Sequence, residues 1–453
     1  MGFIRWLRAL GYGCLALVLA ALSPADFARA GDAAGPAAPG GGGEVLTISE
    51  GLSIATEENR ILKIASRETD MAGQDTIIAR SRMLPKVDAS LDETFLANQP
   101  GAHFGSFQAL TAEKSSLSYE VAVRQTLYDF GANRYSYDAS LNSLEAQRLN
   151  VELLRNRVAL DFVIAYLDLL EAEKRIDVAD KEVQRLQSHL ADATSFYEEG
   201  VITKNDLLEA QVRLSDARQR LLTARNGRDI VESRINSIMA RPLRTPVRVE
   251  DVREINPVLV ELEEAWRTAE EQRLELQVLS RELRIAELDE ARSRAGYFPE
   301  FFARGAYTYT ENRYQLHEDN WSLLLGVNLN VFSGGSVKAE VQKALYRQER
   351  LGELRAKLID DVRVEVETSY LDSENATEKV AVTKDAVSQA DENLRIHRIR
   401  YEEGVGTATD VLDAVTLLRI AETNYDSALY DLKRARARLM FAMGIDLLSA
   451  YAQ

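Results

Sequence analysis

One seven-residue pattern occurs twice in this chain of 453 residues and constrains the fold more than any other feature. Residues 197–203 are Tyr-Glu-Glu-Gly-Val-Ile-Thr, and residues 401–407 are Tyr-Glu-Glu-Gly-Val-Gly-Thr. Apolar residues at helical spacing lie on both sides of each copy, and the central glycine is typical of a helix end because it accepts left-handed backbone angles. The threonine, with an acid three residues later, is typical of a helix start. The pattern therefore predicts two helical hairpins, each with its tip at one copy.

The helices that enter the two tips are predicted to be very long. No proline or glycine follows Gly131 as far as Glu199, and only Gly352 interrupts the span from Gly335 to Glu403, so each span is about 69 residues long. A continuous helix of this size is on the order of 100 Å long at 1.5 Å per residue. Shorter helices predicted at 49–84 and 203–241 together match that length. We therefore expect a long helix beside two half-length helices in each half of the chain.

The hydrophobic period changes from helical to alternating in two places, residues 87–130 and 299–334. Each place contains two alternating segments of roughly 10 residues around a polar loop, which predicts a β-hairpin. Strands of that length cross a bilayer when they are tilted. One face of each strand is apolar and aromatic, and the other is polar. Residues expected on the polar, inward face include Glu120, Arg124, Arg304 and Asn328.

These elements divide the chain into two similar halves behind an export signal. Arg5 and Arg8 precede an apolar run, and Ala28-Arg29-Ala30 follows it as a small-x-small cleavage site. The run is shorter than the roughly 20 residues of a spanning helix, so a cleaved signal peptide is favoured over a membrane anchor. The predicted division is signal peptide 1–30, flexible linker 31–46, repeat 1 at 47–243 with tip 197–206, connector 244–256, repeat 2 at 257–447 with tip 401–413, and tail 448–453.

Composition excludes several classes of function. The formal net charge of −16 argues against a nucleic-acid-binding protein. The only cysteine, Cys14, lies inside the apolar N-terminal run, so we expect no disulfides and no thiol chemistry. The four histidines have no metal-ligand spacing, and no nucleophile–base motif is present. We therefore expect no catalytic site, no metal and no cofactor.

Four strands in one chain cannot close a barrel, and open strand edges cannot lie in lipid because their backbone groups would lack partners. The chain is therefore expected to oligomerise. Two copies would give eight strands, whose side chains fill the interior, whereas twelve strands leave a lumen. Three copies is the smallest assembly that makes a pore. A soluble sheet packed on helices is the alternative, and it is disfavoured because four strands are few to cover such long helices.

These features together resemble the TolC-like outer membrane efflux protein family, over nearly the whole chain from Thr47 to Leu447. The resemblance depends on the doubled order of helix, hairpin, helix, tip and helix. It also depends on the strand ends Tyr-Asp-Phe-Gly at 128–131 and Phe-Ser-Gly-Gly at 332–335. It implies a mainly α fold with β, assembled as a homotrimer with a twelve-stranded barrel in outer-membrane lipid and a helical periplasmic tunnel. It further implies docking to a periplasmic adaptor and to an inner-membrane transporter of the RND or ABC type.

The resemblance also assigns roles to the tips. In the family a tyrosine and paired aspartates of the second tip constrict the periplasmic mouth; Tyr401, Asp410 and Asp413 match them, and Asp206 matches a first-repeat partner. The alternative is that Asp410 only caps its helix and that Asp413 is a solvated acid. Gly406 stands where a latch arginine is expected, so the entrance is held differently. Residues expected to dock the adaptor are Gly200, Val201, Thr203, Gly404, Val405 and Thr407.

Two functions from different classes fit this pattern. The first is a passive exit duct of a tripartite efflux or type I secretion system in the outer membrane of a Gram-negative bacterium. The second is a periplasmic coiled-coil adaptor or scaffold without a membrane barrel, which would share the signal peptide and the hairpins. Only the duct requires four amphipathic strands of bilayer length with aromatic ends, so the duct is favoured. The sequence does not indicate the cargo.

Overall fold

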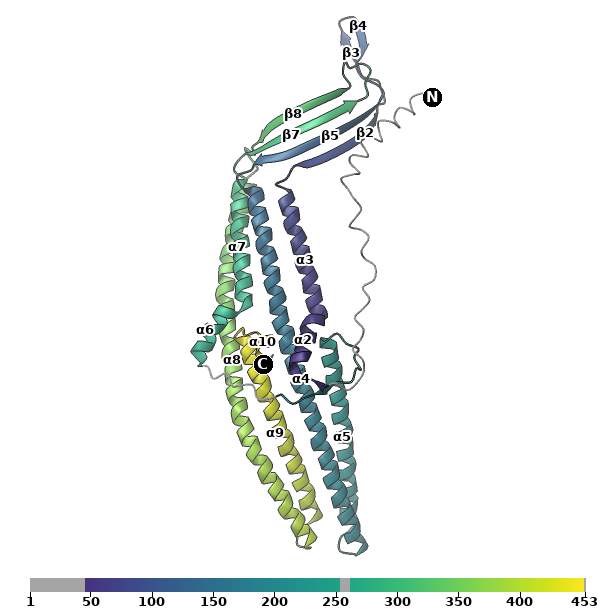
Figure 1. Cartoon of the computed structure of the whole chain (residues 1–453), viewed down its shortest axis with the longest axis vertical. Helices are drawn as coiled ribbons and strands as arrows, with labels where there is room; N and C mark the ends of the chain where they lie inside the picture. Colours follow the sequence, from purple (N-terminus) through teal and green to yellow (C-terminus); the bar gives the residue numbers. More distant parts are fainter. Residues whose placement is uncertain (1–44, 253–260, 452–453) are drawn as a thin grey trace, which may run out of the picture. The chain divides into compact units, whose positions relative to one another are not determined.

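The computed structural model describes residues 45–252 and 261–451. The predicted signal peptide and most of the linker lie outside the described residues, and so does the end of the connector. The described chain is mainly helical, with one four-stranded sheet and two small two-stranded sheets (Figure 1). A mainly α fold with β is therefore confirmed.

The described elements follow one another as helix, hairpin, long helix and helix, and then in the same order again. The helices are α2 (Ile48–Glu58), α3 (Arg60–Ser81), α4 (Ala132–Glu198), α5 (Lys204–Ile238), α6 (Leu262–Gln272), α7 (Leu274–Ala295), α8 (Ser336–Glu402), α9 (Ala408–Ala442) and α10 (Leu447–Tyr451). The strands are β1 (Val45–Leu46), β2 (Lys86–Phe95), β3 (Gly101–Phe104), β4 (Phe107–Leu110), β5 (Ser115–Tyr128), β6 (Arg248–Val249), β7 (Glu300–Thr310) and β8 (Asp319–Asn328).

The two long helices have equal lengths. α4 and α8 each contain 67 residues, and α5 and α9, which follow the tips, each contain 35. Gly200 and Gly404 end the long helices with φ of 76° and 70°, where a side chain would be strained. A Cβ at either glycine would meet no other atom within 4 Å, so backbone angle rather than space requires glycine there. α4 packs along both α3 and α5, and α8 packs along α7 and α9, as the lengths predict.

The first helix of each half is divided, which the sequence does not predict. One helix was expected over 49–84, whereas α2 ends at Glu58 and α3 begins at Arg60. Asn59 stands between them with a ψ of 132°, its Oδ1 accepts from the Ile61 N–H, and its Nδ2 donates to the Ile238 carbonyl at 2.8 Å. The break therefore depends on a tertiary hydrogen bond. The first helix of repeat 2, which is expected to begin at residue 257, lies partly outside the described residues, and a similar break separates α6 from α7.

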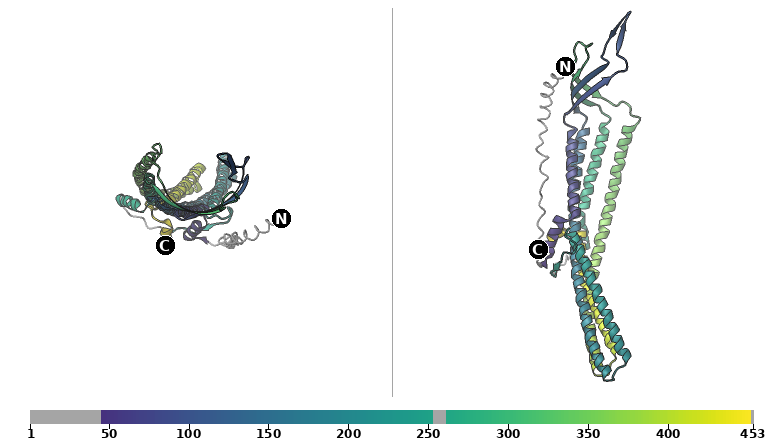
Figure 2. Two further views of the ribbon diagram at one scale, coloured as in Figure 1. Left: turned by 90° about the horizontal axis from the view of Figure 1, so that it is seen from above. Right: turned by 90° about the vertical axis from the view of Figure 1, so that its right-hand side faces the viewer.

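The main sheet has the strand order β2-β5-β7-β8, and every neighbouring pair is antiparallel. Figure 2 shows that the sheet is strongly curved when it is seen from above. The outer strands β2 and β8 each have one neighbour, so both sheet edges are unpaired in the single chain. The loop of the first hairpin contains a further small hairpin, β3–β4, which the sequence did not predict. The last strand ends at Asn328, a little before the end of the hairpin expected over residues 299–334.

The largest core cluster lies around the middle of α4 and includes side chains of α2, β1, α9 and α10. Tyr166 is fully buried there, and its hydroxyl lies 2.9 Å from the Leu46 carbonyl oxygen and 2.8 Å from that of Glu250. It thereby fastens the parallel β1–β6 pair to α4. Two predictions need correction here. Residues 45–46, expected as linker, form β1, and the expected tail is mostly helix α10, with Tyr451 buried.

Candidate functional site

The tip between α4 and α5 is built by two adjacent caps. The Val201 N–H donates to the Phe196 carbonyl at 2.8 Å and closes the end of α4. Thr203 then starts α5 in a capping box: its N–H donates to Asp206 Oδ2 at 2.9 Å, and the Asp206 N–H donates to Thr203 Oγ1 at 3.3 Å. Val201 remains 63 % exposed at the outermost turn. Asp206 is thus occupied in starting its own helix.

The tip between α8 and α9 repeats these caps with one difference. The Thr407 N–H donates to Asp410 Oδ2 at 3.0 Å, and the hydrogen bonds from Thr407 hold the pKa of Asp410 below its usual range. At Gly406 an added Cβ would lie 3.1 Å from the Tyr401 nitrogen and 3.2 Å from the Arg400 carbonyl carbon. A side chain there would therefore press on the backbone of the last helical turn. This close approach gives a physical reason for glycine at the position where an arginine was expected.

Tyr401 lies inside the chain rather than on its surface. It is 4 % exposed, and its ring centroid lies 5.2 Å from that of His189 and 5.3 Å from that of Phe196, both on α4. Its hydroxyl is buried without a hydrogen-bond partner among the described residues, and burial raises the pKa of the Tyr401 phenol. The side chain thus packs α8 and its tip against α4, within one chain.

Asp413 differs from the other two tip aspartates because it takes part in no cap. Its side chain is 70 % exposed, and its Oδ1 lies 3.9 Å from Nη2 of Arg213 on α5. The pair bridges the two tips, but the exposure makes it a weak ion pair. The sequence does not mark Arg213 as a partner of Asp413, because Glu209, one helical turn earlier, offers it an ordinary ion-pair partner within α5 at 3.7 Å.

The predicted inward-facing residues of the strands come together in part. Arg124 lies directly opposite Arg304 in the β5–β7 register, and Arg304 forms an ion pair with Glu120. The Arg124 guanidinium also lies 4.8 Å from the ring centre of Phe302. Asn328 is apart from this group, because it pairs with Glu300 at the other end of β7.

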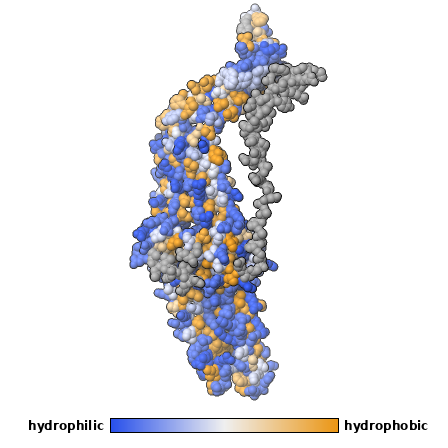
Figure 3. Space-filling view, in the orientation of Figure 1, coloured by the Kyte–Doolittle hydropathy of each residue, from blue (hydrophilic) through white to orange (hydrophobic). Residues whose placement is uncertain are grey.

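The opposite face of the sheet carries aromatic and aliphatic side chains. The Tyr119 ring stacks on Tyr309 at 5.0 Å, and Tyr307 contacts Trp321 at 5.0 Å. Trp321 is 77 % exposed, and Leu323 and Leu325 beside it are also exposed. Figure 3 shows hydrophobic patches over the strands. A sheet with one apolar face this exposed is suited to contact with a partner or with lipid.

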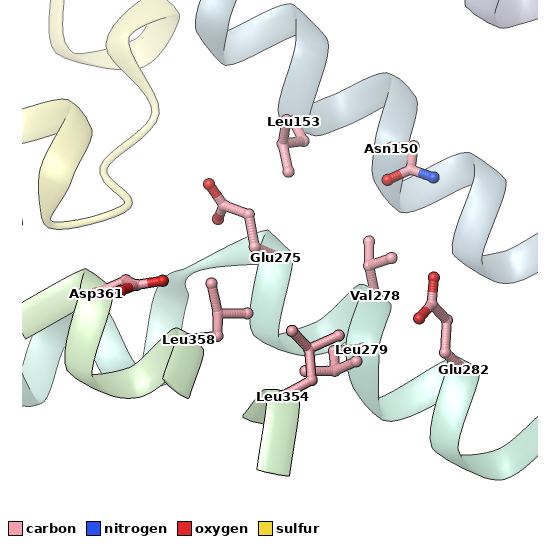
Figure 4. Close-up of a pocket in the computed structure, with 9 residues that line it drawn as sticks. All are labelled: Asn150, Leu153, Glu275, Val278, Leu279, Glu282, Leu354, Leu358 and Asp361. Atoms are coloured by element: carbon pink, nitrogen blue, oxygen red, sulfur yellow. The ribbon is translucent and has the colours of Figure 1, made fainter. Parts of the chain in front are cut away.

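One groove between helices is large enough for a small molecule, at about 270 Å³. Figure 4 shows its apolar floor and its carboxylates, contributed by α4, α7 and α8. The polar groups are carboxylates and one amide, with no nucleophile paired to a base. Within residues 45–252 and 261–451, no three His, Cys, Asp or Glu side chains lie where they could share a metal ion. The lining residues are Asn150, Leu153, Glu275, Val278, Leu279, Glu282, Leu354, Leu358 and Asp361.

Comparison with known proteins identifies the family. The model of the outer membrane efflux protein family matches residues 51–241 and 266–445, which is most of the chain. The chain belongs to the outer membrane efflux protein family. It is therefore an outer-membrane efflux or secretion protein of a Gram-negative bacterium, and the family consists of transport ducts rather than enzymes. The adaptor alternative is not favoured. None of the helices in the described part of the chain is both long and apolar enough to cross a membrane.

Individual relatives agree with this assignment along most of the chain. Alkaline protease secretion protein AprF of Pseudomonas aeruginosa is 23 % identical over 88 % of this chain and 85 % of its own length. Outer membrane protein TolC of Escherichia coli is 21 % identical over 88 % of this chain and 83 % of its own. The crystal structure of the Campylobacter jejuni CmeC outer membrane channel matches with a TM-score of 0.76 at 14 % identity, covering 88 % of this chain and 85 % of that one.

Proposed function

We propose that this chain is the passive exit duct of a tripartite efflux or type I secretion system and that it works as a homotrimer. The observation that carries the proposal is the four-stranded sheet with two unpaired edges and an exposed apolar face. Pairing β8 of one copy with β2 of the next satisfies both edges, and three copies give twelve strands around a lumen. The polar face with Glu120 and Arg304 then lines the pore, and the Tyr and Trp side chains face lipid.

The two halves of the chain act in this proposal as structural repeats. Each supplies one strand hairpin to the membrane barrel and one helical hairpin to a tunnel that extends into the periplasm. The tips, with exposed Val201 and Val405, dock a periplasmic adaptor that connects the duct to an inner-membrane transporter of the RND or ABC type. The transporter supplies the energy and selects the cargo, and the duct has no enzymatic activity and needs no cofactor.

The periplasmic entrance is proposed to lie at the second tip. Asp413 is the tip aspartate that takes part in no cap, its side chain is 70 % exposed, and three copies would form a carboxylate ring that attracts cations. Asp410 and Asp206 contribute by holding the tip helices in place through their caps. Tyr401 contributes by packing the second tip onto α4.

Membrane fractionation and channel recording test the duct. The full chain should behave as a heat-modifiable outer-membrane oligomer and should form channels in planar bilayers. A monomeric protein released with the periplasm would refute the duct and favour the adaptor alternative.

The carboxylate ring has a separate test. Divalent cations or low pH should reduce the conductance of the wild type, and Asp413→Ala should remove most of that sensitivity. Asp216→Ala, which deletes another exposed acid on the α5 side, is the matched control and should respond as the wild type does. Equal sensitivity in the wild type and in Asp413→Ala would contradict the ring.

A further inference from the structure

Glu182 on α4 is the most deeply buried charged side chain in the described part of the chain, at 1 % exposure. Its carboxylate accepts two hydrogen bonds from Arg220 of α5, with Nε at 3.1 Å and Nη2 at 2.9 Å. Arg419 of α9 approaches from the other side, with its Nε 3.2 Å from Oε1. One carboxylate therefore joins three helices that belong to both hairpins.

A second ion pair lies one helical turn along α4. Arg185 donates from Nη1 and Nη2 to the two carboxylate oxygens of Glu422 on α9, at 2.9 and 2.8 Å. α4 thus presents an acid and then a base, whereas α9 presents a base and then an acid. Both helices thus supply one acid and one base to the contact, and the two ion pairs lie within one helical turn of each other on α4.

The apolar contacts around these charges explain why they must stay paired. Val183 and Leu186 of α4 are buried with Leu221 of α5 and Val415 of α9 in one cluster. A carboxylate that loses its cations in such surroundings is left desolvated and uncompensated, which is strongly unfavourable. Nearer the tips, α5 and α9 are linked by the weak Arg213–Asp413 ion pair. The polar connection between the hairpins is therefore stronger at this buried cluster than at the tips, and Arg434 of α9 adds a further link to Asp168 and Glu171 of α4.

We propose that the cluster of Glu182, Arg185, Arg220, Arg419 and Glu422, here called the clasp, seats the α8–α9 tip against the α4–α5 tip, with Glu182 as its positioning residue. The proposal rests on the proposed duct function for its consequence: a seated second tip narrows the entrance, and release of the clasp lets α9 move away. No residue of the clasp is among those assigned to the tips themselves.

Hydrogen–deuterium exchange on the full-length oligomer tests the clasp without depending on conduction. Glu182→Gln keeps the shape of the side chain but removes its charge. We expect exchange of the amides in residues 408–422 to accelerate by about tenfold or more, the change that follows from losing one charged hydrogen bond of ordinary strength. Glu392→Gln is the matched control, because it removes an exposed acid paired with Arg395 on α8 and should leave these amides unchanged.

A charge exchange covers the case in which Glu182→Gln fails to assemble. Arg185→Glu alone should accelerate exchange in residues 408–422, and Arg185→Glu combined with Glu422→Arg should restore slow exchange. If only the size of these side chains mattered, and not their charge, the double variant would not restore slow exchange. Wild-type exchange in Glu182→Gln, or a double variant as fast as Arg185→Glu, would overturn the clasp.

Bilayer recordings of the same variants separate the clasp from the duct. If the clasp narrows the entrance, Glu182→Gln channels should have a higher conductance than wild-type channels. A wild type that forms no channels would refute the duct alone, since the exchange result is independent of it. Wild-type conductance in a Glu182→Gln oligomer whose second tip exchanges fast would overturn the link between seating and the entrance.

Discussion

Tyr401 offers the sharpest test of how the second tip is held, because two variants separate its ring from its hydroxyl. The ring contacts His189 and Phe196 in a buried cluster, whereas the hydroxyl is buried without a partner among the described residues. Tyr401→Ala should cost about 3–5 kcal/mol, as for other large buried aromatic residues. Tyr401→Phe keeps the ring and removes an unsatisfied polar group, so the free energy of unfolding should stay the same or rise by about 1 kcal/mol.

The assay is single-channel conductance together with thermal unfolding of the oligomer. Tyr401→Ala should loosen the tip and raise conductance, and Tyr401→Phe should behave as the wild type in both measurements. His189→Phe is a useful companion, since it preserves an aromatic partner for the Tyr401 ring. Tyr401→Phe channels that open as widely as Tyr401→Ala channels would refute the reasoning, because the hydroxyl would then be the holding group.

Two further predictions concern packing and pH. Gly51→Ala should lower the free energy of unfolding by about 1–3 kcal/mol, because its Cβ would lie 2.1 Å from Cζ of the fully buried Phe162. In chemical denaturation, adding Phe162→Leu to Gly51→Ala should recover much of that loss. If the losses of free energy from the two substitutions simply add, this clash is contradicted. Burial lowers the pKa of His189, and Asp192 and Arg398 face its ring. As the pH falls, the imidazole is therefore protonated in the unfolded chain before it is protonated in the folded chain. Stability should therefore fall as pH drops below about 6.5, and His189→Gln should flatten that part of the denaturation-midpoint profile; an unchanged slope would exclude this histidine as its source.

The hairpins were predictable because their signals are local. Gly200 and Gly404 adopt positive φ, as a helix end requires, and each following threonine caps the next helix with its own acid. Alternation likewise gave the strands of the main sheet, because one face is apolar and the other polar. None of these signals needs information from another part of the chain.

Apart from the small β3–β4 hairpin, the main features that were missed depend on distant residues. The break at Asn59 has no glycine or proline to mark it and relies on the carbonyl of Ile238. Glu182 and Arg419 are separated by a large part of the sequence, and each alone is an ordinary charge on a helix. The caps of Asp206 and Asp410 were predicted from the threonine three residues before each acid, but the burial of Tyr401 inside one chain was not. Periodicity predicts which elements form, whereas tertiary contacts determine which of their side chains meet.

The equal lengths of α4 and α8 limit how this chain can change size during evolution. Each residue adds 1.5 Å to a helix, so deleting seven residues from α8 alone would shift its tip by about 10 Å relative to the other. The α4–α9 ion pairs would then be out of register, and the two tips would no longer end together. Length changes should therefore occur in matched sets, in α4 with α5 and in α8 with α9. Relatives with longer or shorter hairpins should show paired insertions or deletions in both halves of the chain.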